Sequence, residues 1–436
     1  MIVSCRHNLY YKIFVTIVVP LWLRNLDRID YNNAMAGEWL NSREAAKRLG
    51  VSAATLYAYV SRGLLRSEAI DGRRERRYRA DEIARLRHRR QVGRKAESIA
   101  NHALDFGTPV LESALTLIED SRLYYRGFDA TELARHAALE DVARLLWQCD
   151  DKPFSAGNLP PLTTALRRAW IAAAPLSPVD RCLVVLPAAA ALDHPSWVED
   201  RAAMLETGVR VLRLLTAAVT GRPLSAQPVH EELAEAWRVP AEHALLLRAA
   251  LVLSADHEFN ASTFAARVVA STGANLYGAV TAGLAAINGP RHGGLTRRVA
   301  SLLDDVHEAK DLDAELARRV RDRIYIPGFG HPLYPDGDAR AATLFALLRE
   351  AVPRSSELAF AERLCAAAER LLDRKANVDF ATVTLERVLG LPKDSALALF
   401  LLGRTVGWIA HALEQAAHGA LIRPRARYTG PPPGLT

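Results

Sequence analysis

The chain has 436 residues, half of them hydrophobic, so it exceeds the usual size of one domain and is predicted to form two or three domains with a large buried core. Its four cysteines lie far apart and form no CxxC pair, which argues against a zinc site and a disulfide framework and favours a reducing, cytoplasmic location. Positive charge is concentrated near the start: residues 35–95 hold 16 Lys and Arg but 7 Asp and Glu, whereas residues 96–436 carry a small net negative charge. This pattern favours a nucleic-acid-facing module on a mildly acidic body.

Residues 1–34 are interpreted as a leader. They contain the apolar run YYKIFVTIVVPLWL, residues 10–23, which is short for a membrane-spanning helix and is interrupted by Lys12 and Pro20. A signal peptide would need a small-residue cleavage site, and none follows the run. We therefore expect a disordered leader or a start codon assigned too far upstream, with a membrane anchor as the alternative, and we predict no membrane partner for the rest of the chain.

Residues 35–95 are predicted to form a winged helix-turn-helix domain. Asn41 followed by Glu44 is a helix-capping pattern, the next apolar residues share one helix face, and a glycine separates a second short helix. Further along, Asp71 and Gly72 suit a hairpin turn between arginine-rich strands. Two short helices followed by such a hairpin are the elements of this fold.

This segment resembles the MerR/excisionase type of winged helix-turn-helix. The resemblance implies that the second helix, which carries Thr55, Tyr57 and Arg62, enters the major groove of DNA, with the wing arginines beside phosphates. Because such folds also dock proteins, a protein-binding module is the alternative to DNA contact.

Residues 96–436 are predicted to be mostly α-helical. Stretches such as ALEDVARLLW and AELARRVRDRIY place apolar residues at helical spacing, and the alternating pattern of strands is nearly absent. The motifs GKS, GKT, HExxH and GxSxG do not occur, and GFGHPL lacks the third glycine of a dinucleotide fingerprint. We therefore predict no bound cofactor and no metal.

One loop interrupts the helical pattern around a histidine. In IPGFGHPLYPDGDAR, residues 326–340, two glycines permit unusual backbone angles and close approaches. Pro327 and Pro332 prevent a helix from running through His331. His331 is therefore expected on a loop of defined shape.

Three other segments place ionisable residues beside glycine, proline or small polar residues: DHEFNAST from residue 256, NGPRHGGLT from residue 288 and NVDF from residue 377. Two glycines follow His292, so a ligand or another backbone can approach its ring. Asp379 lies between two apolar residues, where burial would raise its pKa and make it a stronger base. Two histidines on tight loops and such an aspartate suit the chemistry of a carbon acid, with a base for a C–H proton and imidazoles for an enol oxygen and a carbonyl. A two-histidine, one-carboxylate site for iron or zinc is the alternative that these residue types leave open.

The order of these motifs resembles the citrate synthase family. Between residues 108 and 430 the chain contains, in order, SRLYYRGFDATELA, DHEFNASTFAAR, GPRHGG, PGFGHPLYPDGDAR, NVDF, GRTVGWIAHALEQ and IRPRARYTG. The resemblance implies an all-α body of two domains, a homodimer, and condensation of acetyl-CoA with oxaloacetate followed by hydrolysis to citrate and CoA. It assigns residues 96–292 and 396–436, which include the tail, to a large domain, and residues 293–395 to a small domain that closes over it.

The resemblance also implies three catalytic residues. Asp379 would remove a proton from the acetyl methyl group. His292 would hydrogen-bond the developing enol oxygen. His331 would donate to the oxaloacetate carbonyl as the new carbon–carbon bond forms.

Four further residues are implied to bind oxaloacetate. His257 would orient the substrate, and its two carboxylates would be held by Arg340, Arg404 and Arg423. In the family the last of these arginines reaches across from the neighbouring subunit. Fork-shaped guanidinium groups suit this task, because their hydrogen bonds to carboxylates are strong and directional.

Three features depart from the family pattern. After GPRHGG the chain has LTRR, residues 295–298, where small and acidic residues are usual. Ala339 stands where proline is common, and no Lys or Arg lies between His331 and Asp338, so one expected contact with a CoA phosphate is missing. The third is the N-terminal module itself. Two alternatives therefore stand beside citrate synthase: a 2-methylcitrate synthase that uses propionyl-CoA, and a DNA-binding regulator that uses the body as a metabolite sensor.

Overall fold

The computed structural model describes residues 39–49, 51, 53–61, 65–69, 76–80, 82–83, 111–197, 200–426 and 428–430. It divides the chain into two compact units, the first ending at Val110 and the second beginning at Leu111. The expected leader, Arg62 and the expected turn at Asp71 and Gly72 lie outside the described residues.

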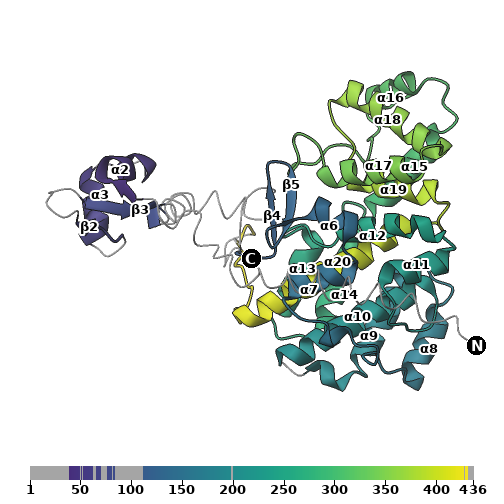
Figure 1. The fold of residues 1–436 in the computed structure, drawn as a ribbon, viewed down its shortest axis with the longest axis horizontal. Helices are drawn as coiled ribbons and strands as arrows, with labels where there is room; N and C mark the ends of the chain where they lie inside the picture. Colours follow the sequence, from purple (N-terminus) through teal and green to yellow (C-terminus); the bar gives the residue numbers. More distant parts are fainter. Residues whose placement is uncertain are drawn as a thin grey trace, which may run out of the picture. The chain divides into compact units, whose positions relative to one another are not determined.

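The first unit contains two helices and a three-stranded antiparallel sheet in the order β1-β3-β2 (Figure 1). Its elements are β1 (Trp39–Asn41), α2 (Ser42–Leu49), α3 (Ala53–Ser61), β2 (Glu68–Ala69) and β3 (Arg76–Arg79). The side chain of Asn41 accepts a hydrogen bond from the Glu44 N–H at 2.9 Å, and the Glu44 carboxylate accepts one from the Asn41 N–H at 3.0 Å, which confirms the predicted capping pattern. Leu56, Tyr78 and Ile83 belong to a core of the unit's own.

The second unit is mostly helical, which confirms the all-α prediction for the body (Figure 1). Its helices are α6 (Ala130–His136), α7 (Leu139–Trp147), α8 (Thr164–Ala173), α9 (Pro178–Ala190), α10 (Arg201–Thr220), α11 (Val229–Trp237), α12 (Ala244–Leu253), α13 (Ala261–Ala270), α14 (Leu276–Ile287), α15 (Leu295–Val306), α16 (Leu312–Arg321), α17 (Ala339–Ala351), α18 (Ser356–Leu372), α19 (Val378–Val388) and α20 (Ser395–His418). Short 3-10 turns lie at Lys152–Phe154, His194–Trp197 and Ala241–His243.

A short antiparallel sheet, which the sequence pattern did not predict, opens this unit. It consists of β4 (Thr116–Glu119), β5 (Arg122–Tyr125) and β6 (Phe128–Asp129), in that order. The strands are only two to four residues long, too short for alternation to stand out from a helical background. The sheet is anchored because the fully buried Tyr125 hydroxyl donates to the carbonyl of Val252 at 2.9 Å.

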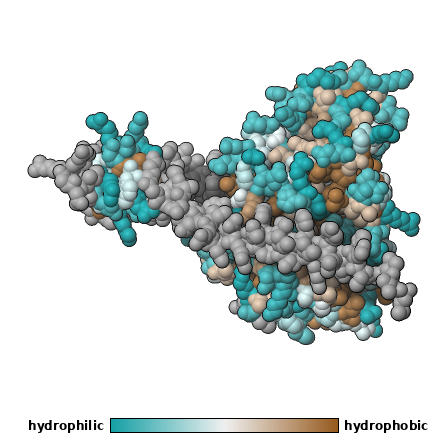
Figure 2. Space-filling model, viewed as in Figure 1, coloured by the Kyte–Doolittle hydropathy of each residue, from teal (hydrophilic) through white to brown (hydrophobic). Residues whose placement is uncertain are grey.

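Helix α20, yellow in Figure 1, forms the centre of the second unit, with α7, α12, α13 and α14 packed against it. Two glycines allow the end of α12 to come close: a Cβ on Gly403 would lie 2.5 Å from the Leu251 carbonyl oxygen, and one on Gly407 would lie 2.6 Å from Asp256 Oδ1. By length and composition α20 could cross a membrane, but its apolar stretch is entirely buried in the protein. It is therefore a core helix. The face of the molecule in Figure 2 shows mainly hydrophilic residues, with hydrophobic ones between them.

Helices α15 to α19 gather at one end of the second unit, green in Figure 1. α19 packs against α15, α17 and α18, and it also contacts α20. These helices fall within residues 293–395, the segment for which the sequence predicts a small domain. That division into domains stays a prediction.

Candidate active site

Four of the seven candidate residues lie at or just before the starts of helices, while His331 lies in a loop, Arg404 within α20 and Arg423 after it. His257 lies three residues before Asn260, the N-cap of α13, and His292 lies just before α15. Arg340 and Asp379 lie in the first turns of α17 and α19. The N-cap side chains of Asn260, Asp338 and Asn377 accept hydrogen bonds from the first turns of α13, α17 and α19 and so fix these helix starts.

The loop of residues 326–338 is joined to the segment that precedes α19. The Gly330 N–H donates to the Lys375 carbonyl at 2.8 Å, and the Asn377 N–H donates to the Gly328 carbonyl at 2.9 Å. Gly328 has a φ of +91°, and a Cβ there would lie 3.0 Å from Phe380. Glycine is therefore required for this close approach, which brings the His331 loop beside the helix that carries Asp379.

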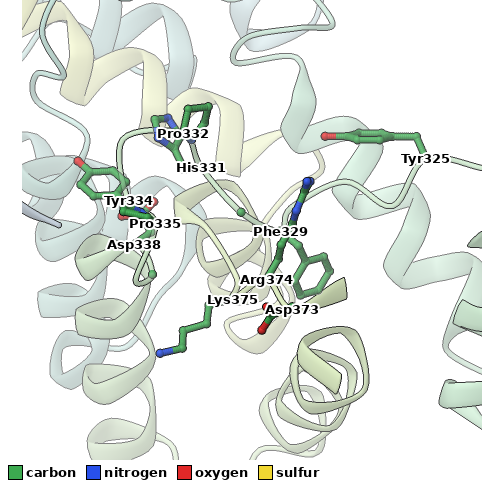
Figure 3. Close-up of a pocket in the computed structure, with 12 residues that line it drawn as sticks. Tyr325, Phe329, His331, Pro332, Tyr334, Pro335, Asp338, Asp373, Arg374 and Lys375 are labelled. Carbon is green, nitrogen blue, oxygen red and sulfur yellow. The ribbon is translucent and has the colours of Figure 1, made fainter. Parts of the chain in front are cut away.

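His257, His331 and Tyr334 form a cluster of three rings. The ring centroids of the two histidines are 5.1 Å apart, and each lies 5.1 to 5.5 Å from the Tyr334 ring. The Tyr334 hydroxyl lies 2.9 Å from His257 Nε2. Figure 3 shows His331 and Tyr334 on the same loop. The sequence interpretation missed Tyr334, although an aromatic residue inside a glycine- and proline-rich loop is a signal that could have found it.

His292 is held by the start of α13. Its Nε2 lies 2.7 Å from Ser262 Oγ, which also accepts a hydrogen bond from the Trp408 indole at 3.1 Å. The glycine after His292 packs against the end of α14, because a Cβ on Gly293 would lie 2.7 Å from the Ile287 carbonyl oxygen. Gly293 therefore allows another stretch of backbone to pack closely beside it. The sequence predicts that the glycines after His292 allow close approach of either a ligand or another backbone.

Two of the three candidate arginines are buried in the site. The Arg340 guanidinium donates to both carboxylate oxygens of Asp338 at 2.9 Å. Arg404, only 1% exposed, donates through Nε to the Ser254 carbonyl at 2.9 Å, while its Nη1 has no hydrogen-bond partner among the described residues. Arg423 lies in the extended segment after α20, where it is exposed and makes no hydrogen bond or ion pair with the described residues. The fold therefore brings Arg340 and Arg404 to the site within one chain, but not Arg423.

Burial and the two arginines set the charge state of the site. Burial raises the pKa of Asp379 to about 7, against the opposing effect of the Arg340 charge. Burial, with Arg404 as the second cause, lowers the pKa of His292 to about 4, and burial, with Arg340 second, does the same for His331. Burial, Arg340 and Arg404 hold the pKa of His257 well below its usual range. All three imidazoles are therefore neutral at neutral pH.

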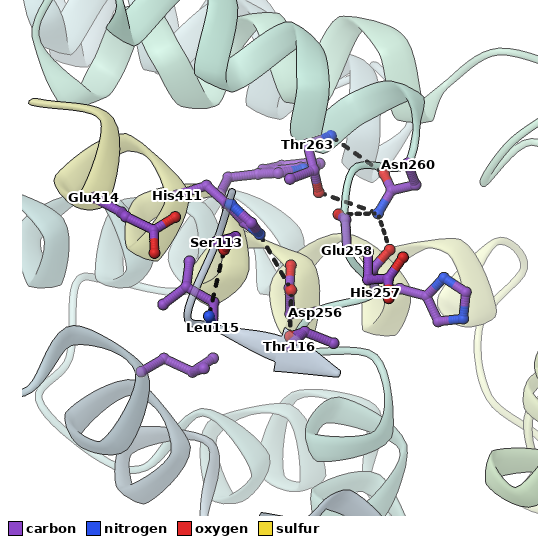
Figure 4. A network of polar contacts seen from close by, with 12 residues as sticks. Ser113, Leu115, Thr116, Asp256, His257, Glu258, Asn260, Thr263, His411 and Glu414 are labelled. Atoms are coloured by element: carbon purple, nitrogen blue, oxygen red, sulfur yellow. Dashed lines mark hydrogen bonds and ion pairs between the residues drawn. The ribbon is translucent and has the colours of Figure 1, made fainter. Parts of the chain in front are cut away.

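A buried polar network lies behind His257 and was not predicted from the sequence (Figure 4). Asp256 Oδ2 accepts from the Thr116 hydroxyl at 2.5 Å and lies 3.2 Å from His411 Nε2. His411 Nδ1 in turn lies 3.2 Å from a nitrogen of Arg267, which also contacts Glu414. Burial alone would raise the pKa of Asp256. The charge and hydrogen bond of the adjacent His411 have the opposite effect and contribute to a pKa below the usual value of this carboxyl. The network therefore connects α20 with the loop on which His257 lies.

A pocket of about 450 Å³ opens beside His331 (Figure 3). Its lining includes Tyr325, Asp338, Arg374 and Lys375. The Lys375 ammonium donates to the Asp336 carbonyl at 3.2 Å, which places a positive charge against the loop. Among the described residues, no group of three His, Cys, Asp or Glu side chains is arranged to hold a metal ion.

Comparisons with known proteins identify the family of the chain. The sequence model described as "Citrate synthase, C-terminal domain" matches residues 104–425, and that described as "MerR HTH family regulatory protein" matches residues 40–92. The citrate synthase of Mycolicibacterium smegmatis is 32% identical over 341 residues, which cover 72% of this chain and 90% of that protein. The 2-methylcitrate synthase 1 of Corynebacterium glutamicum is 35% identical over 183 residues, 41% of this chain and 48% of that protein.

Among solved structures, the ternary complex of carboxymethyl coenzyme A and oxaloacetate with citrate synthase from Thermoplasma acidophilum has a TM-score of 0.64 and 25% identity. The match covers 77% of this chain and 97% of that one. Fold, sequence and the order of the motifs lead to one conclusion: the chain belongs to the citrate synthase family and is an enzyme of the citrate synthase type, with a MerR-type helix-turn-helix segment ahead of its catalytic body.

Proposed function

We propose that the protein condenses acetyl-CoA with oxaloacetate and hydrolyses the product to citrate and CoA. The observation that carries the proposal is the buried guanidinium of Arg404, with Nη1 unpartnered, in a site with three neutral imidazoles. An unpaired buried donor costs free energy, so its retention indicates a ligand that pairs with it. A dicarboxylate with a keto oxygen between its charges matches both the cationic and the neutral donors.

The first step removes a proton from the acetyl methyl group. Asp379 is suited as the base, because a pKa of about 7 leaves a large fraction ionised at neutral pH and makes the carboxylate more basic than an ordinary aspartate. The proton passes to Asp379, and the carbon–hydrogen electron pair forms the enol. The Ser262 hydroxyl lies 2.7 Å from His292 Nε2 and 2.8 Å from Asn260 Oδ1; in the proposed step its one proton points to His292, so the neutral ring keeps its proton on Nδ1 and offers a hydrogen bond to the enol oxygen.

The second step forms the carbon–carbon bond. The enol carbon attacks the keto carbon of oxaloacetate, and the keto oxygen takes a proton from His331. The backbone N–H of Leu333 donates to His331 Nδ1 at 3.2 Å, so the neutral ring carries its proton on Nε2. Arg404 and Arg340 hold the two carboxylates during this step, and Asp338 fixes the orientation of Arg340. Water then attacks the thioester carbon and gives one proton back to His331, Asp379 passes its proton to the sulfur so that CoA leaves as the thiol, and the new carboxyl group releases the second water proton to solvent.

The pocket beside His331 is proposed to take the CoA portion. The loop itself lacks the Lys or Arg that the family pattern predicts there, but Arg374 and Lys375 line the same pocket from the neighbouring segment. A Cβ on Gly330 would lie 2.9 Å from the Arg374 side chain, and one on Gly337 would lie 2.8 Å from the Lys375 side chain. Two cations packed on the loop can supply the charge that the loop lacks.

The proposed enzyme is a homodimer in which Arg423 of one chain completes the site of the other. The support is the exposure of Arg423, on the extended segment after α20. Hydrogen bonds from the Ile422 N–H to Ser271 Oγ and from the Gln415 side chain to the Ala420 carbonyl hold the start of this segment, while Arg423 itself makes no bond to the described residues. An exposed arginine on an extended segment is suited to reach a neighbouring chain.

The test is release of free thiol from acetyl-CoA by the purified full chain, with and without oxaloacetate. The proposal expects release that depends on oxaloacetate and is unaffected by a chelator. Oxaloacetate-independent release, or none, would refute it. Sensitivity to chelators would instead favour the metal alternative.

Propionyl-CoA in the same assay tests the related function, 2-methylcitrate synthesis, which the resemblance to the Corynebacterium glutamicum protein favours. An apolar pocket discriminates one methylene by only about 1 to 3 kcal/mol, so the ratio of kcat/KM values for the two acyl-CoAs decides the assignment.

We further propose that residues 40–92 bind DNA. The match to the MerR family, the capped helix α2, the second helix α3 and the antiparallel pair β2–β3 support this, and Tyr57 on α3 is 50% exposed. Binding of the full chain to DNA from upstream of its own coding region, weakening as salt rises, is the expected result. Absence of binding would favour the protein-docking alternative.

A further inference from the structure

Tyr334 contacts both histidines that are proposed to bind oxaloacetate. It lies on the loop next to His331, it is only 2% exposed, and its hydroxyl reaches His257 Nε2 at 2.9 Å across the site. The Arg340 guanidinium lies 5.1 Å from the centre of the Tyr334 ring, in a cation–π contact. One side chain therefore contacts a proposed proton donor, a substrate-orienting histidine and a carboxylate-binding arginine.

The backbone of the loop fixes the place of Tyr334. The Tyr334 N–H donates to the His331 carbonyl at 3.0 Å, and the Gly337 N–H donates to the Tyr334 carbonyl at 3.1 Å. Two successive turns therefore meet at Tyr334, and Gly337 adopts a φ of +117° that a side chain would strain. Pro332 and Pro335 restrict the same turns. The hydroxyl is held in position and does not have to be ordered when substrate binds.

The direction of the hydrogen bond follows from the protons available. Burial keeps the hydroxyl of Tyr334 protonated, because it raises the pKa of Tyr334 to about 12, and it keeps His257 neutral. Among the described residues, the hydroxyl has one hydrogen-bond partner, His257 Nε2. If Tyr334 accepted from Nε2–H, its own buried proton would have no acceptor, which is unfavourable. Donation by Tyr334 satisfies both groups and leaves the ring proton of His257 on Nδ1.

We propose that Tyr334 is a positioning residue of the reaction: by donating to His257 Nε2, it fixes the imidazole as the Nδ1–H tautomer, which presents a hydrogen-bond donor to the 2-oxo dicarboxylate. This inference rests on the proposed function and extends it to a residue that makes no bond to the reacting atoms. Figure 4 shows the His257 ring directed away from the Asp256–His411 network, so that network does not supply the second contact to the ring. Without Tyr334 the ring is free to present a lone pair in place of a donor.

The test compares Tyr334→Phe with Tyr124→Phe in the full chain. Tyr334→Phe keeps the ring contacts and removes only the hydroxyl, while Tyr124 is a half-buried tyrosine of β5 whose hydroxyl makes no hydrogen bond to the described residues. We expect kcat/KM for oxaloacetate to fall about 10- to 100-fold in Tyr334→Phe, with KM for acetyl-CoA within about twofold of wild type, because one buried hydrogen bond is lost on one substrate only. Tyr124→Phe should match wild type.

Nitrogen NMR of protein labelled with 15N-histidine gives a second readout. The His257 signals, assigned with His257→Gln, should show a protonated Nδ1 in wild type and a mixture of tautomers in Tyr334→Phe. Equal losses for both substrates, or unchanged kinetics with a protonated Nε2 in wild type, would overturn the inference. A wild-type protein without thiol release would refute the proposed function instead, and the NMR spectrum would still decide whether Tyr334 fixes the ring proton.

Discussion

Replacing Asp379 with asparagine should inactivate the enzyme and stabilise the fold at the same time. The Asp379 carboxylate makes no hydrogen bond in the described structure, so Asp379→Asn keeps the shape and loses no partner. As the proposed base it contributes about 10²- to 10⁴-fold to turnover. We therefore expect kcat for thiol release to fall by that factor.

The stability change follows from the pKa. Asp379 has a folded pKa of about 7 against an ordinary value of 3.8, which corresponds to about 4 kcal/mol of cost for holding the charge in the folded protein. For an acid with a raised folded pKa, this cost is absent below pH 3.8, grows as pH rises to about 7 and stays constant above. Because the side chain is half-buried and partly solvated, we expect about 2 to 4 kcal/mol. Asp379→Asn should exceed wild type by that amount at pH 8 and by much less at pH 4.5.

Denaturant unfolding at both pH values measures this difference, and thiol release measures turnover. Asp120→Asn is the matched control, because Asp120 is an exposed turn residue with a φ of +50° that asparagine also adopts. A variant with kcat near wild type, or one that is less stable than wild type at pH 8, would refute the reasoning.

The remaining predictions concern binding, assembly, DNA and packing. Arg404→Lys should raise KM for oxaloacetate about 10- to 100-fold without changing KM for acetyl-CoA, because the fork is lost, while the exposed Arg222→Lys should have no effect. Co-expressed Arg423→Ala and His331→Ala chains, each inactive alone, should regain about a quarter of wild-type activity, because half of randomly paired dimers contain one intact site; no recovery would show that Arg423 acts within its own chain or not at all. Tyr57→Ala should weaken DNA binding at each salt concentration and leave thiol release unchanged, and equal affinity of both proteins would contradict a role of α3 in the groove. Gly407→Ala should lower stability by about 1 to 3 kcal/mol or more, because its Cβ would collide with the Ala255 carbonyl oxygen, whereas Gly157→Ala, with open space around it, should change little in a melting experiment.

Local features of the molecule could be predicted from the sequence. The helix cap at Asn41, the helical body and the loop around His331 follow from residue types at fixed spacing. The raised pKa of Asp379 follows from its apolar neighbours, because burial is the largest cause. The motif order led to the family, which the comparisons show.

Contacts between distant segments could not be predicted in this way. The hydrogen bond from Tyr334 to His257 spans 77 positions, and the contact of Asp256 with His411 spans 155. Nothing in the residues around His411 distinguishes it from a satisfied core histidine, because its partner Asp256 lies on a distant loop between α12 and α13. The strands β4 to β6 were missed since each is stabilised by pairing, not by its own composition.

The central place of α20 has a consequence for biosynthesis. Helices α7, α10, α12, α13, α14 and α19 all pack against it, yet the ribosome makes every one of them before α20. The nascent body therefore exposes the apolar surfaces that α20 later covers, and it reaches its compact state only after residues 395–418 leave the exit tunnel. Chaperones that recognise exposed apolar surface should accordingly hold this chain until translation has passed that segment.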